Sequence, residues 1–305
     1  MTSQAVIKVK KLTKRYGNLA AVDGISFEVF TGEIFGLLGE NGAGKTTTLE
    51  MIEGLRRPTS GNIKVLDKDV SLDPSEIKKQ IGVQLQSSAY YSFLSLREIL
   101  ELFCSFYNSS VDADELLKMV DLESKSKSLV NQLSGGQKQR FSIVASLVND
   151  PEIVFLDEPT TGLDPIARRN LWKLITDIKK RGKTIILTTH YMEEAEALCD
   201  RVAIMDSGKI LALDETHKLV DKIKEPYSIT FVTNKLDGQI KKLEKFAIVD
   251  LLHGKEDHYH LKIKSHKGLM SALKIVETID PESLEVGRAT LEDVFIELTG
   301  KRIEE

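Results

Sequence analysis

The sequence predicts an α/β fold built on a mostly parallel sheet, and two observations lead to this prediction. Residues 153–156 and 184–187 are uninterrupted apolar runs separated by a helical pattern over residues 166–180, which is typical of buried parallel strands joined by a crossover helix. Residues 34–38 form another short apolar run that enters a glycine-rich loop, and residues 45–53 continue as a helix. Strand, loop and helix in this order predict the central part of the sheet.

The segments on either side of this loop predict two additions to the sheet. Residues 5–30 alternate apolar and polar side chains around a turn, which predicts an antiparallel β layer. Residues 88–150 are mostly helical in pattern, which predicts an inserted helical subdomain. Its expected helices cover residues 96–107, 113–120 and 137–148. A further strand is expected at residues 202–205.

A charged stretch with a proline, residues 221–226, separates a predicted first domain, residues 1–222, from a second, residues 223–305. The second is expected to be a small α+β domain with the element order strand, helix, strand, strand, helix, strand, which matches a ferredoxin-like sandwich. The expected segments are residues 227–233, 237–246, 248–252, 259–263, 268–277 and 284–286, followed by an amphipathic helix over residues 291–298.

Composition excludes several classes of protein. The chain has 305 residues, of which 41% are hydrophobic, so it can bury a full core. Its net charge of −4 gives no general attraction to nucleic acid, and we expect no nucleic-acid partner. Cys104 and Cys199 are too few and too far apart for a disulfide framework. No run approaches the roughly 18 apolar residues that a membrane span needs.

Residues 39–46 have the composition of a phosphate-binding loop, which assigns the main domain to the P-loop NTPase class. Gly39, Gly42 and Gly44 allow backbone N–H groups to turn toward phosphate oxygens at the start of a helix. Lys45 supplies positive charge at the β- and γ-phosphates, and the hydroxyl of Thr46 suits Mg²⁺. The alternative, a glycine turn with an incidental lysine, does not explain the strand before it and the helix after it.

Three further polar residues follow buried strands and are expected in the same crevice, because parallel sheets place ligands beyond the carboxyl ends of their strands. Asp157 would hold Mg²⁺, and Glu158 would orient and deprotonate the attacking water. His190 ends the next strand and would contact the γ-phosphate. Alternatively, Asp157 and Glu158 begin an ordinary loop before Pro159, and His190 is structural.

The segment Leu133-Ser134-Gly135-Gly136-Gln137 lies between these two groups. By itself it is a helix capping box, in which the Ser134 hydroxyl and the Gln137 amide satisfy free backbone N–H groups.

In this order, the segments resemble the ATP-binding cassette family, the nucleotide-binding subunits of ABC transporters. Within residues 1–222, residues 39–46 resemble the Walker A loop and residues 133–137 the family signature. Residues 153–157 resemble the Walker B strand, and residues 162–164 resemble the D-loop. Three single residues complete the resemblance: the Q-loop glutamine Gln86, the switch histidine His190, and Tyr16, the aromatic that stacks on adenine.

The resemblance implies a set of site residues. The implied ATP-binding residues are Tyr16, Gly39, Glu40, Asn41, Gly42, Ala43, Gly44, Lys45, Thr46 and Thr47. A second subunit would contribute Ser134, Gly135, Gly136, Gln137 and Asp164 in trans. The implied Mg²⁺ ligands are Thr46, Gln86 and Asp157, and the implied catalytic residues are Glu158, His190 and Gln86.

The resemblance also implies partners. ATP would hold together a head-to-tail pair, most simply a homodimer, and hydrolysis would open it and drive an integral membrane permease. Such a subunit is cytoplasmic and lies on the inner face of the membrane through the permease. Residues 291–300, with residues 162–165, resemble the ATPases of ABC-2 type exporters of drugs and antibiotics.

Several alternatives stay open at this point. An import ATPase shares every motif of the core, whereas a soluble ABC ATPase fits less well because no second cassette or long coiled coil is present. Residues 291–300 also fit an ordinary amphipathic helix. Tyr90, Tyr91 and Phe93 would either line a cleft for the membrane partner or pack within the helical subdomain.

Overall fold

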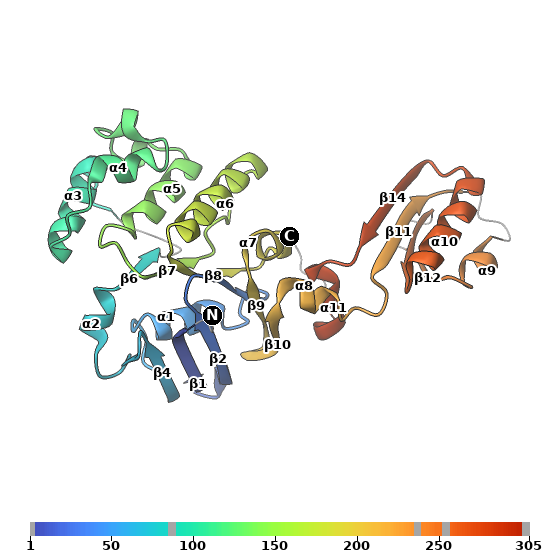
Figure 1. Ribbon diagram of the computed structural model, residues 1–305, viewed down its shortest axis with the longest axis horizontal. Coiled ribbons are helices and arrows are strands. Elements are labelled where there is room, and N and C mark those ends of the chain that lie inside the picture. The colour runs from blue at the N-terminus through green and yellow to red at the C-terminus, as the bar shows by residue number, and fades with distance from the viewer. Residues whose placement is uncertain (1–3, 85–89, 235–238, 252–256, 301–305) are drawn as a thin grey trace. The chain divides into compact units, whose positions relative to one another are not determined.

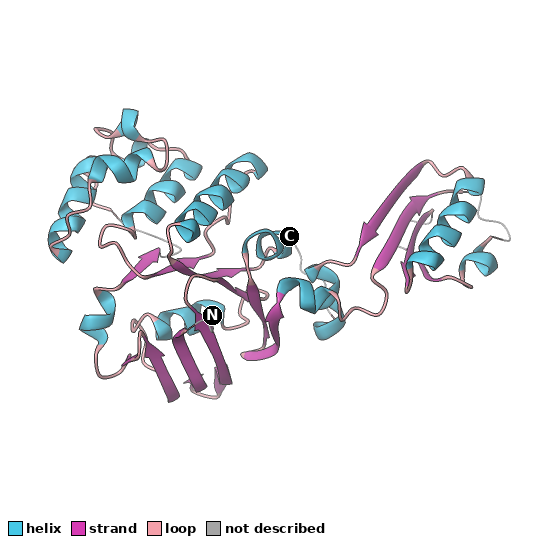
Figure 2. Ribbon diagram, viewed as in Figure 1, coloured by secondary structure: helices cyan, strands magenta, loops and turns pink. Residues whose placement is uncertain are grey.

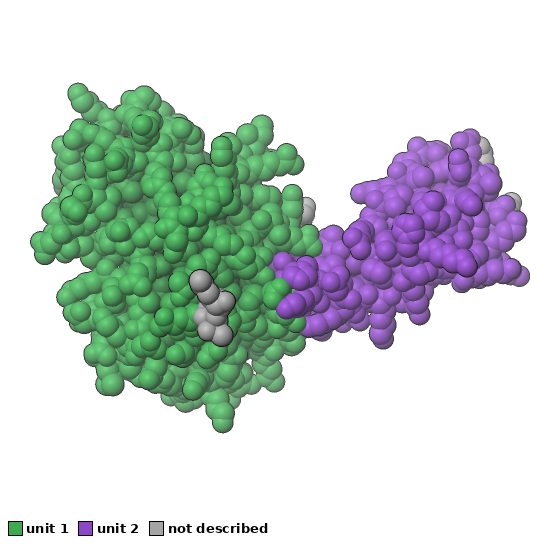
Figure 3. Space-filling model, in the orientation of Figure 1, with its two compact units in different colours: residues 1–215, 305 green, residues 216–304 purple. Residues whose placement is uncertain are grey.

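The structure is a computed structural model that describes residues 4–84, 90–234, 239–251 and 257–300 (Figure 1). The chain forms two compact units, a first that ends at Glu215 and a second that begins at Thr216 (Figure 3). Among the helices of the described ranges, none combines the length and the hydrophobicity that a membrane span requires.

A six-stranded sheet in the order β10-β9-β3-β8-β7-β6 forms the centre of the first unit. Its strands pair in parallel except for β10, which is antiparallel to β9. The strands are β3 (Ile34–Leu38), β6 (Ile81–Gln84), β7 (Ile153–Asp157), β8 (Thr184–Thr189), β9 (Arg201–Asp206) and β10 (Lys209–Glu215). Every residue of β3, β7 and β8 is buried, as uninterrupted apolar runs require. The prediction of a mostly parallel sheet is confirmed.

The predicted antiparallel layer is also present, as a four-stranded sheet in the order β2-β1-β4-β5. Strands β1 (Ala5–Tyr16) and β2 (Leu19–Phe30) pair across the expected turn. The sequence did not predict β4 (Ser60–Val65) and β5 (Lys68–Asp69), because in β4 only Ile63 and Val65 are buried and this pattern is too short to recognise. Apolar side chains of this layer, of β3 and of helix α1 (Lys45–Ile52) share one core.

The helical part of the first unit contains α3 (Leu96–Tyr107), α4 (Ala113–Lys118) and α5 (Gly135–Ala145). Figure 1 shows these three helices together, away from strands β1, β2 and β4. Helix α3 has the predicted bounds. Helix α5 begins before the predicted residue 137 because Ser134 accepts a hydrogen bond from the backbone N–H of Gln137, which places the helix start at Gly135. The first unit also contains the α-helices α2 (Pro74–Lys78), α6 (Pro165–Lys180) and α7 (Met192–Leu198).

The second unit contains a four-stranded antiparallel sheet in the order β12-β13-β11-β14 (Figure 2). Its elements follow the predicted order of strand, helix, strand, strand, helix, strand. They are β11 (Tyr227–Val232), α9 (Ile240–Leu243), β12 (Ala247–Leu251), β13 (His258–Ile263), α10 (His266–Ile279) and β14 (Ser283–Arg288). Helix α10 buries Leu269, Ala272 and Val276 in one core with Ile229 and Phe231 of β11.

The two compact units divide earlier than residue 222, where the charged stretch placed a boundary. Helix α8 (Thr216–Val220) packs against α11 (Leu291–Thr299), so α8 groups with the second unit. Leu219 of α8 and Phe295 of α11 are both buried. A contact between helices so distant in sequence leaves no signal in the local pattern of either.

Candidate functional site

The glycine-rich loop connects the carboxyl end of β3 to α1 at the middle of the sheet, because β3 lies between β8 and β9. Close backbone contacts hold the loop. A Cβ at Gly39 would lie 2.3 Å from the carbonyl oxygen of Met205, and a Cβ at Gly44 would lie 2.4 Å from that of Ala21. Gly44 also has φ of +100° at the cap of α1. Only glycine fits at these two positions, and the first N–H groups of α1 point into the loop.

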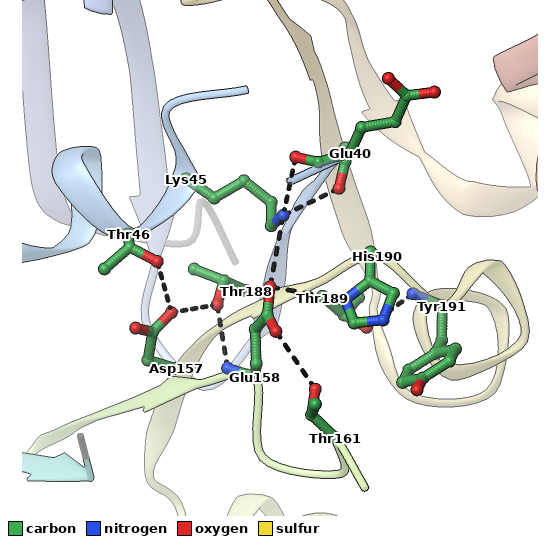
Figure 4. A network of polar contacts seen from close by, with 11 residues as sticks. Glu40, Lys45, Thr46, Asp157, Glu158, Thr161, Thr188, Thr189, His190 and Tyr191 are labelled. Carbon is green, nitrogen blue, oxygen red and sulfur yellow. Dashed lines mark hydrogen bonds and ion pairs between the residues drawn. The ribbon is translucent and has the colours of Figure 1, made fainter. Parts of the chain in front are cut away.

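Lys45 is the first residue of α1 and its ammonium group turns back into the loop (Figure 4). Its Nζ donates to the carbonyl oxygens of Gly39 at 2.8 Å and Glu40 at 3.1 Å, and it lies 3.4 Å from Oε1 of Glu158. The side chain is only 4% exposed. Burial therefore lowers the pKa of Lys45, while the negative charges of Glu158 and Asp157 oppose that shift.

Thr46 and Asp157 bring two oxygen ligands together beside Lys45. The Thr46 hydroxyl donates to Oδ1 of Asp157 at 3.1 Å, and the Thr188 hydroxyl donates to the same oxygen (Figure 4). Burial raises the pKa of Asp157, and these two hydrogen bonds oppose the increase. A hydroxyl and a carboxylate at one point are hard oxygen donors of the kind that Mg²⁺ prefers, so the residues present fit this ion.

Glu158 follows β7 in a left-handed backbone conformation, with φ of +45°. Thr188 holds this turn, since the Glu158 N–H donates to the carbonyl oxygen and the hydroxyl of Thr188. The carboxylate then meets three partners: Lys45, the Thr161 hydroxyl at 3.2 Å and Nδ1 of His190 at 3.4 Å. His190 is the main cause that lowers the pKa of Glu158 to about 2, with help from Lys45 and against the effect of burial. This carboxylate is ionised at neutral pH.

The signature segment and the D-loop lie together at a second place in the first unit. Ser134 caps α5 as predicted, with the Gln137 N–H donating to its hydroxyl, and Asp164 caps α6 by accepting from the N–H groups of Ile166 and Ala167. Both helix starts border one cavity of about 350 Å³. Its lining residues are Ser134, Gly135, Gly136, Gln137, Arg140, Gly162, Leu163, Asp164, Ala167 and Asn170.

The structure thus places the expected residues in two groups. Lys45, Thr46, Asp157, Glu158 and His190 form one cluster, which we call the phosphate-loop cluster. The second group lines the cavity just described, which we call the signature cavity; no residue of the phosphate-loop cluster is among the described residues that line it.

The other expected residues of the glycine-rich loop, residues 39–44 and 47, flank Lys45 and Thr46 in the chain, and Tyr16 belongs to neither group. The ring of Tyr16 lies at the end of β1, with Nζ of Lys14 5.2 Å from its centroid and the Arg56 guanidinium 5.6 Å away. Gln86 lies outside the described residues.

Sequence reasoning missed Thr188 and Thr161, which orient Asp157 and Glu158. Thr188 is a buried polar residue near the carboxyl end of β8, two positions before His190. The rule that placed His190 in the crevice, a polar side chain where a parallel strand ends, also applies to Thr188.

The aromatic segment after residue 89 is half-buried at one position and exposed at two others. Tyr90 packs edge-on against Phe141 at 5.3 Å, inside the helical part. Tyr91 is 48% exposed and Phe93 is 75% exposed. A nearby cavity of about 380 Å³ is lined by aromatic side chains of α3 and by Glu53, among other residues. Its α3 aromatics are Phe103, Phe106 and Tyr107.

Comparison with known proteins assigns this arrangement to a family. A sequence profile described as ABC transporter matches residues 22–161. The Nod factor export ATP-binding protein I of Burkholderia orbicola (strain AU 1054) is 36% identical, over 99% of this chain and 100% of that protein. A fluoroquinolones export ATP-binding protein of Mycobacterium tuberculosis (strain CDC 1551 / Oshkosh) is 39% identical, over 98% of this chain and 94% of that protein.

Solved structures agree with the family. An ATP-binding subunit of an ABC transporter superposes with a TM-score of 0.65 and 30% identity, covering 71% of this chain and 92% of that one. A dimeric ATP-binding cassette in a post-hydrolysis state, bound to ADP and Pi, gives a TM-score of 0.63 and 29% identity, covering 68% and 98%. The chain therefore belongs to the ATP-binding proteins of ABC transporters, and it is an ATPase of that family.

Proposed function

We propose that this ATPase drives export of a substrate through a separate membrane subunit, by pairing head to tail with a second copy of itself around ATP. The names of its relatives support the direction of transport, because both the Burkholderia and the Mycobacterium proteins are export ATP-binding proteins. The single observation that carries the pairing is the separation of the phosphate-loop cluster from the signature cavity within one chain.

The signature cavity has the features of a half-site that another molecule completes. A Cβ at Gly135 would meet no atom of the described residues within 4 Å, so packing inside the chain does not require glycine there. Glycine costs about 1 kcal/mol relative to alanine inside a helix. Close approach of a ligand to the start of α5 explains this cost, and the positive end of a helix attracts phosphate. Ser134, Gly135, Gly136, Gln137 and Asp164 would contact ATP held by the second copy.

The phosphate-loop cluster is the other half-site. Phosphate oxygens would replace the loop carbonyls as partners of Lys45 and would accept from the backbone N–H groups of residues 39–47. Thr46 and Asp157 would hold Mg²⁺, with Gln86 as a further ligand, and the ion would neutralise phosphate charge. Tyr16 would stack on the adenine, where the flanking cations of Lys14 and Arg56 add positive charge.

Glu158 is the proposed base for the attacking water, and His190 the proposed contact to the γ-phosphate. The contacts with His190 and Lys45 lower the pKa of Glu158 to about 2. When phosphate oxygens attract Lys45 away from Glu158, one of these causes weakens and the carboxylate becomes a stronger base. ATP binding would therefore make Glu158 a stronger base at the same time as it places the substrate in the site.

The proposed membrane partner places this chain on the cytoplasmic face of the membrane. Exposed Tyr91 and Phe93, and the aromatic cavity near α3, are the proposed docking region for that subunit. No nucleic-acid partner is proposed, in keeping with the net charge of −4.

Glu158→Gln tests the proposed function. The amide keeps the shape of the side chain but cannot take a proton, so we expect ATP binding to persist while turnover falls by about 10²-fold or more. Size-exclusion chromatography should then show a stable dimer in ATP and a monomer without it. Glu152→Gln is the matched control, because Glu152 precedes the same strand and is exposed. Hydrolysis by Glu158→Gln at the rate of the unaltered protein would contradict the role of Glu158.

A further inference from the structure

We propose that Arg168 and Tyr191 are positioning residues, which hold the ring of His190 against Glu158 and link it to the start of α6. The inference rests on the proposed function, because it gives His190 a role in ATP hydrolysis. Neither residue belongs to the motifs that carried the family resemblance.

The contact begins with an unusual direction of the Tyr191 side chain. Successive side chains of a strand point to opposite faces, so His190 and Tyr191 would normally point apart. Here β8 ends at Thr189, and the Tyr191 N–H donates to the Thr189 hydroxyl at 2.9 Å. This turn brings the two rings together, with centroids 4.1 Å apart (Figure 4). The Tyr191 ring therefore limits where the His190 ring can move.

Arg168 supports the Tyr191 ring from α6. Its guanidinium carbon lies 4.2 Å from the centroid of that ring, within the range of a cation–π contact. Its Nε is buried and has no hydrogen-bond partner among the described residues. The ring is thus a principal neighbour of this cation, and an alkyl side chain at position 191 would leave the cation without it.

A second contact, one turn further along α6, holds the segment that follows β8. The Trp172 Nε1–H donates to Oε1 of Glu194 at 3.1 Å, and Glu194 is fully buried. Arg168 and Trp172 are four residues apart and so share one face of the helix. That face of α6 is therefore fastened to the segment that begins at His190.

Residues on another face of the first turns of α6 line the signature cavity. Asp164 caps this helix, and Ala167 and Asn170 line that cavity with Ser134 and Gly135. A second copy that fills the signature cavity would press on the first turns of α6. Because α6 contacts Tyr191 through Arg168, a shift of α6 also shifts His190. Nδ1 of His190 lies 3.4 Å from Oε1 of Glu158, so the same shift changes this contact.

The test compares two substitutions at Tyr191 in the full chain. Tyr191→Leu removes the ring, so His190 loses its support; we expect kcat to fall roughly ten- to hundredfold with the KM for ATP little changed. Tyr191→Phe keeps the ring and should restore kcat. Arg168→Leu should lower kcat as Tyr191→Leu does, and the double variant should be no worse than either, because both act through one contact.

Arg169→Leu is the control for α6, since Arg169 is exposed on another face of the helix; its kcat should not change. The inference is overturned if Tyr191→Leu hydrolyses ATP normally, if Tyr191→Phe loses as much activity as Tyr191→Leu, or if KM rises in place of the loss in kcat. In each case Glu158→Gln reports separately on the proposed function. An inactive Glu158→Gln beside a fully active Tyr191→Leu removes only the positioning role.

Discussion

At the scale of single residues, several ionisable side chains are buried. Lys45 and Glu158 are 4% and 8% exposed, and each offsets the cost of burying the other. Glu53, at the end of α1, is different. It is 2% exposed, and neither of its carboxylate oxygens has a hydrogen-bond partner among the described residues. Burial, followed by the charges of Asp157 and Glu50, raises its pKa to about 8.

Glu53 should therefore make stability depend on pH. The folded protein keeps the Glu53 proton up to pH of about 8, whereas the unfolded chain releases it near the ordinary pKa of 4.5. Between these values the folded state binds more protons, so the free energy of unfolding falls as pH rises, by up to about 1.4 kcal/mol per pH unit. Glu53→Gln should remove this contribution and be the more stable protein at the alkaline end of that range.

Urea unfolding between pH 5.5 and 8.5 measures the difference, because the other titrating groups contribute equally to both proteins and cancel. The exposed Glu152→Gln serves as control. Parallel pH profiles for Glu53→Gln and the unaltered protein would show that the Glu53 carboxyl titrates normally.

At the scale of elements, three helix starts form much of the two proposed half-sites. Helices α1, α5 and α6 begin at Gly44, Ser134 and Asp164, and all three starts lie in the two half-sites. Ser134 and Asp164 satisfy some of the free N–H groups with their own side chains, which fixes where each helix begins. The glycines beside Ser134 leave the start of α5 open to an approaching molecule.

Gly135→Ala separates the effect of this glycine on helix stability from its effect on the approach of a molecule to the start of α5. The new methyl group meets no described atom of the chain within 4 Å, and alanine favours helix, so the melting temperature should be unchanged or higher. The same methyl group would stand between α5 and the phosphate of the second copy. We therefore expect ATP-dependent dimerisation and hydrolysis to fall by about tenfold or more, by analogy with the loss of one donor to a reacting oxyanion.

Thermal unfolding and an ATPase assay on the same samples decide this prediction. Lys138→Ala, an exposed position of the same helix, is the control for a change in helix propensity. Loss of stability in Gly135→Ala would mean that the glycine serves the fold.

At the scale of the whole molecule, the chain has separate cores. One apolar cluster joins the β1, β2 and β4 layer to β3 and α1, and another lies between α10 and the sheet of the second unit. The clusters share no residue. Each unit therefore has its own source of stability.

The first unit should fold without the second. A chain of residues 1–215 ends with β10 and contains both half-sites, so we expect cooperative unfolding and ATP hydrolysis at a rate of the same order as the full chain. Circular dichroism during heating and an ATPase assay provide the measurements. If the shortened chain unfolds without a transition, or binds no ATP, the first unit depends on residues beyond Glu215.

Local patterns predicted those elements whose burial is complete or regular. Helix α3 has its predicted bounds because Ser95 and Glu98 form a capping box and one face is apolar. Strand β6 has four residues with a glycine among them, which gives no pattern. Gly82 is needed because a Cβ there would lie 2.0 Å from the carbonyl oxygen of Ser146, a contact made only after folding.

The linear sequence is sufficient to recognise the chemical features of the candidate site: a phosphate loop, a carboxylate pair after a buried strand, a histidine after the next, and a capped helix start with two glycines. These features depend on neighbouring residues, so they can be recognised in the linear chain. Which of these features meet depends on the three-dimensional packing of the chain. The parallel pairing of β7 with β8 brings Thr188 and His190 to Asp157 and Glu158, and packing on α6 brings Arg168 to Tyr191. Contacts of this kind depend on strand register and helix packing, which involve the whole core at once.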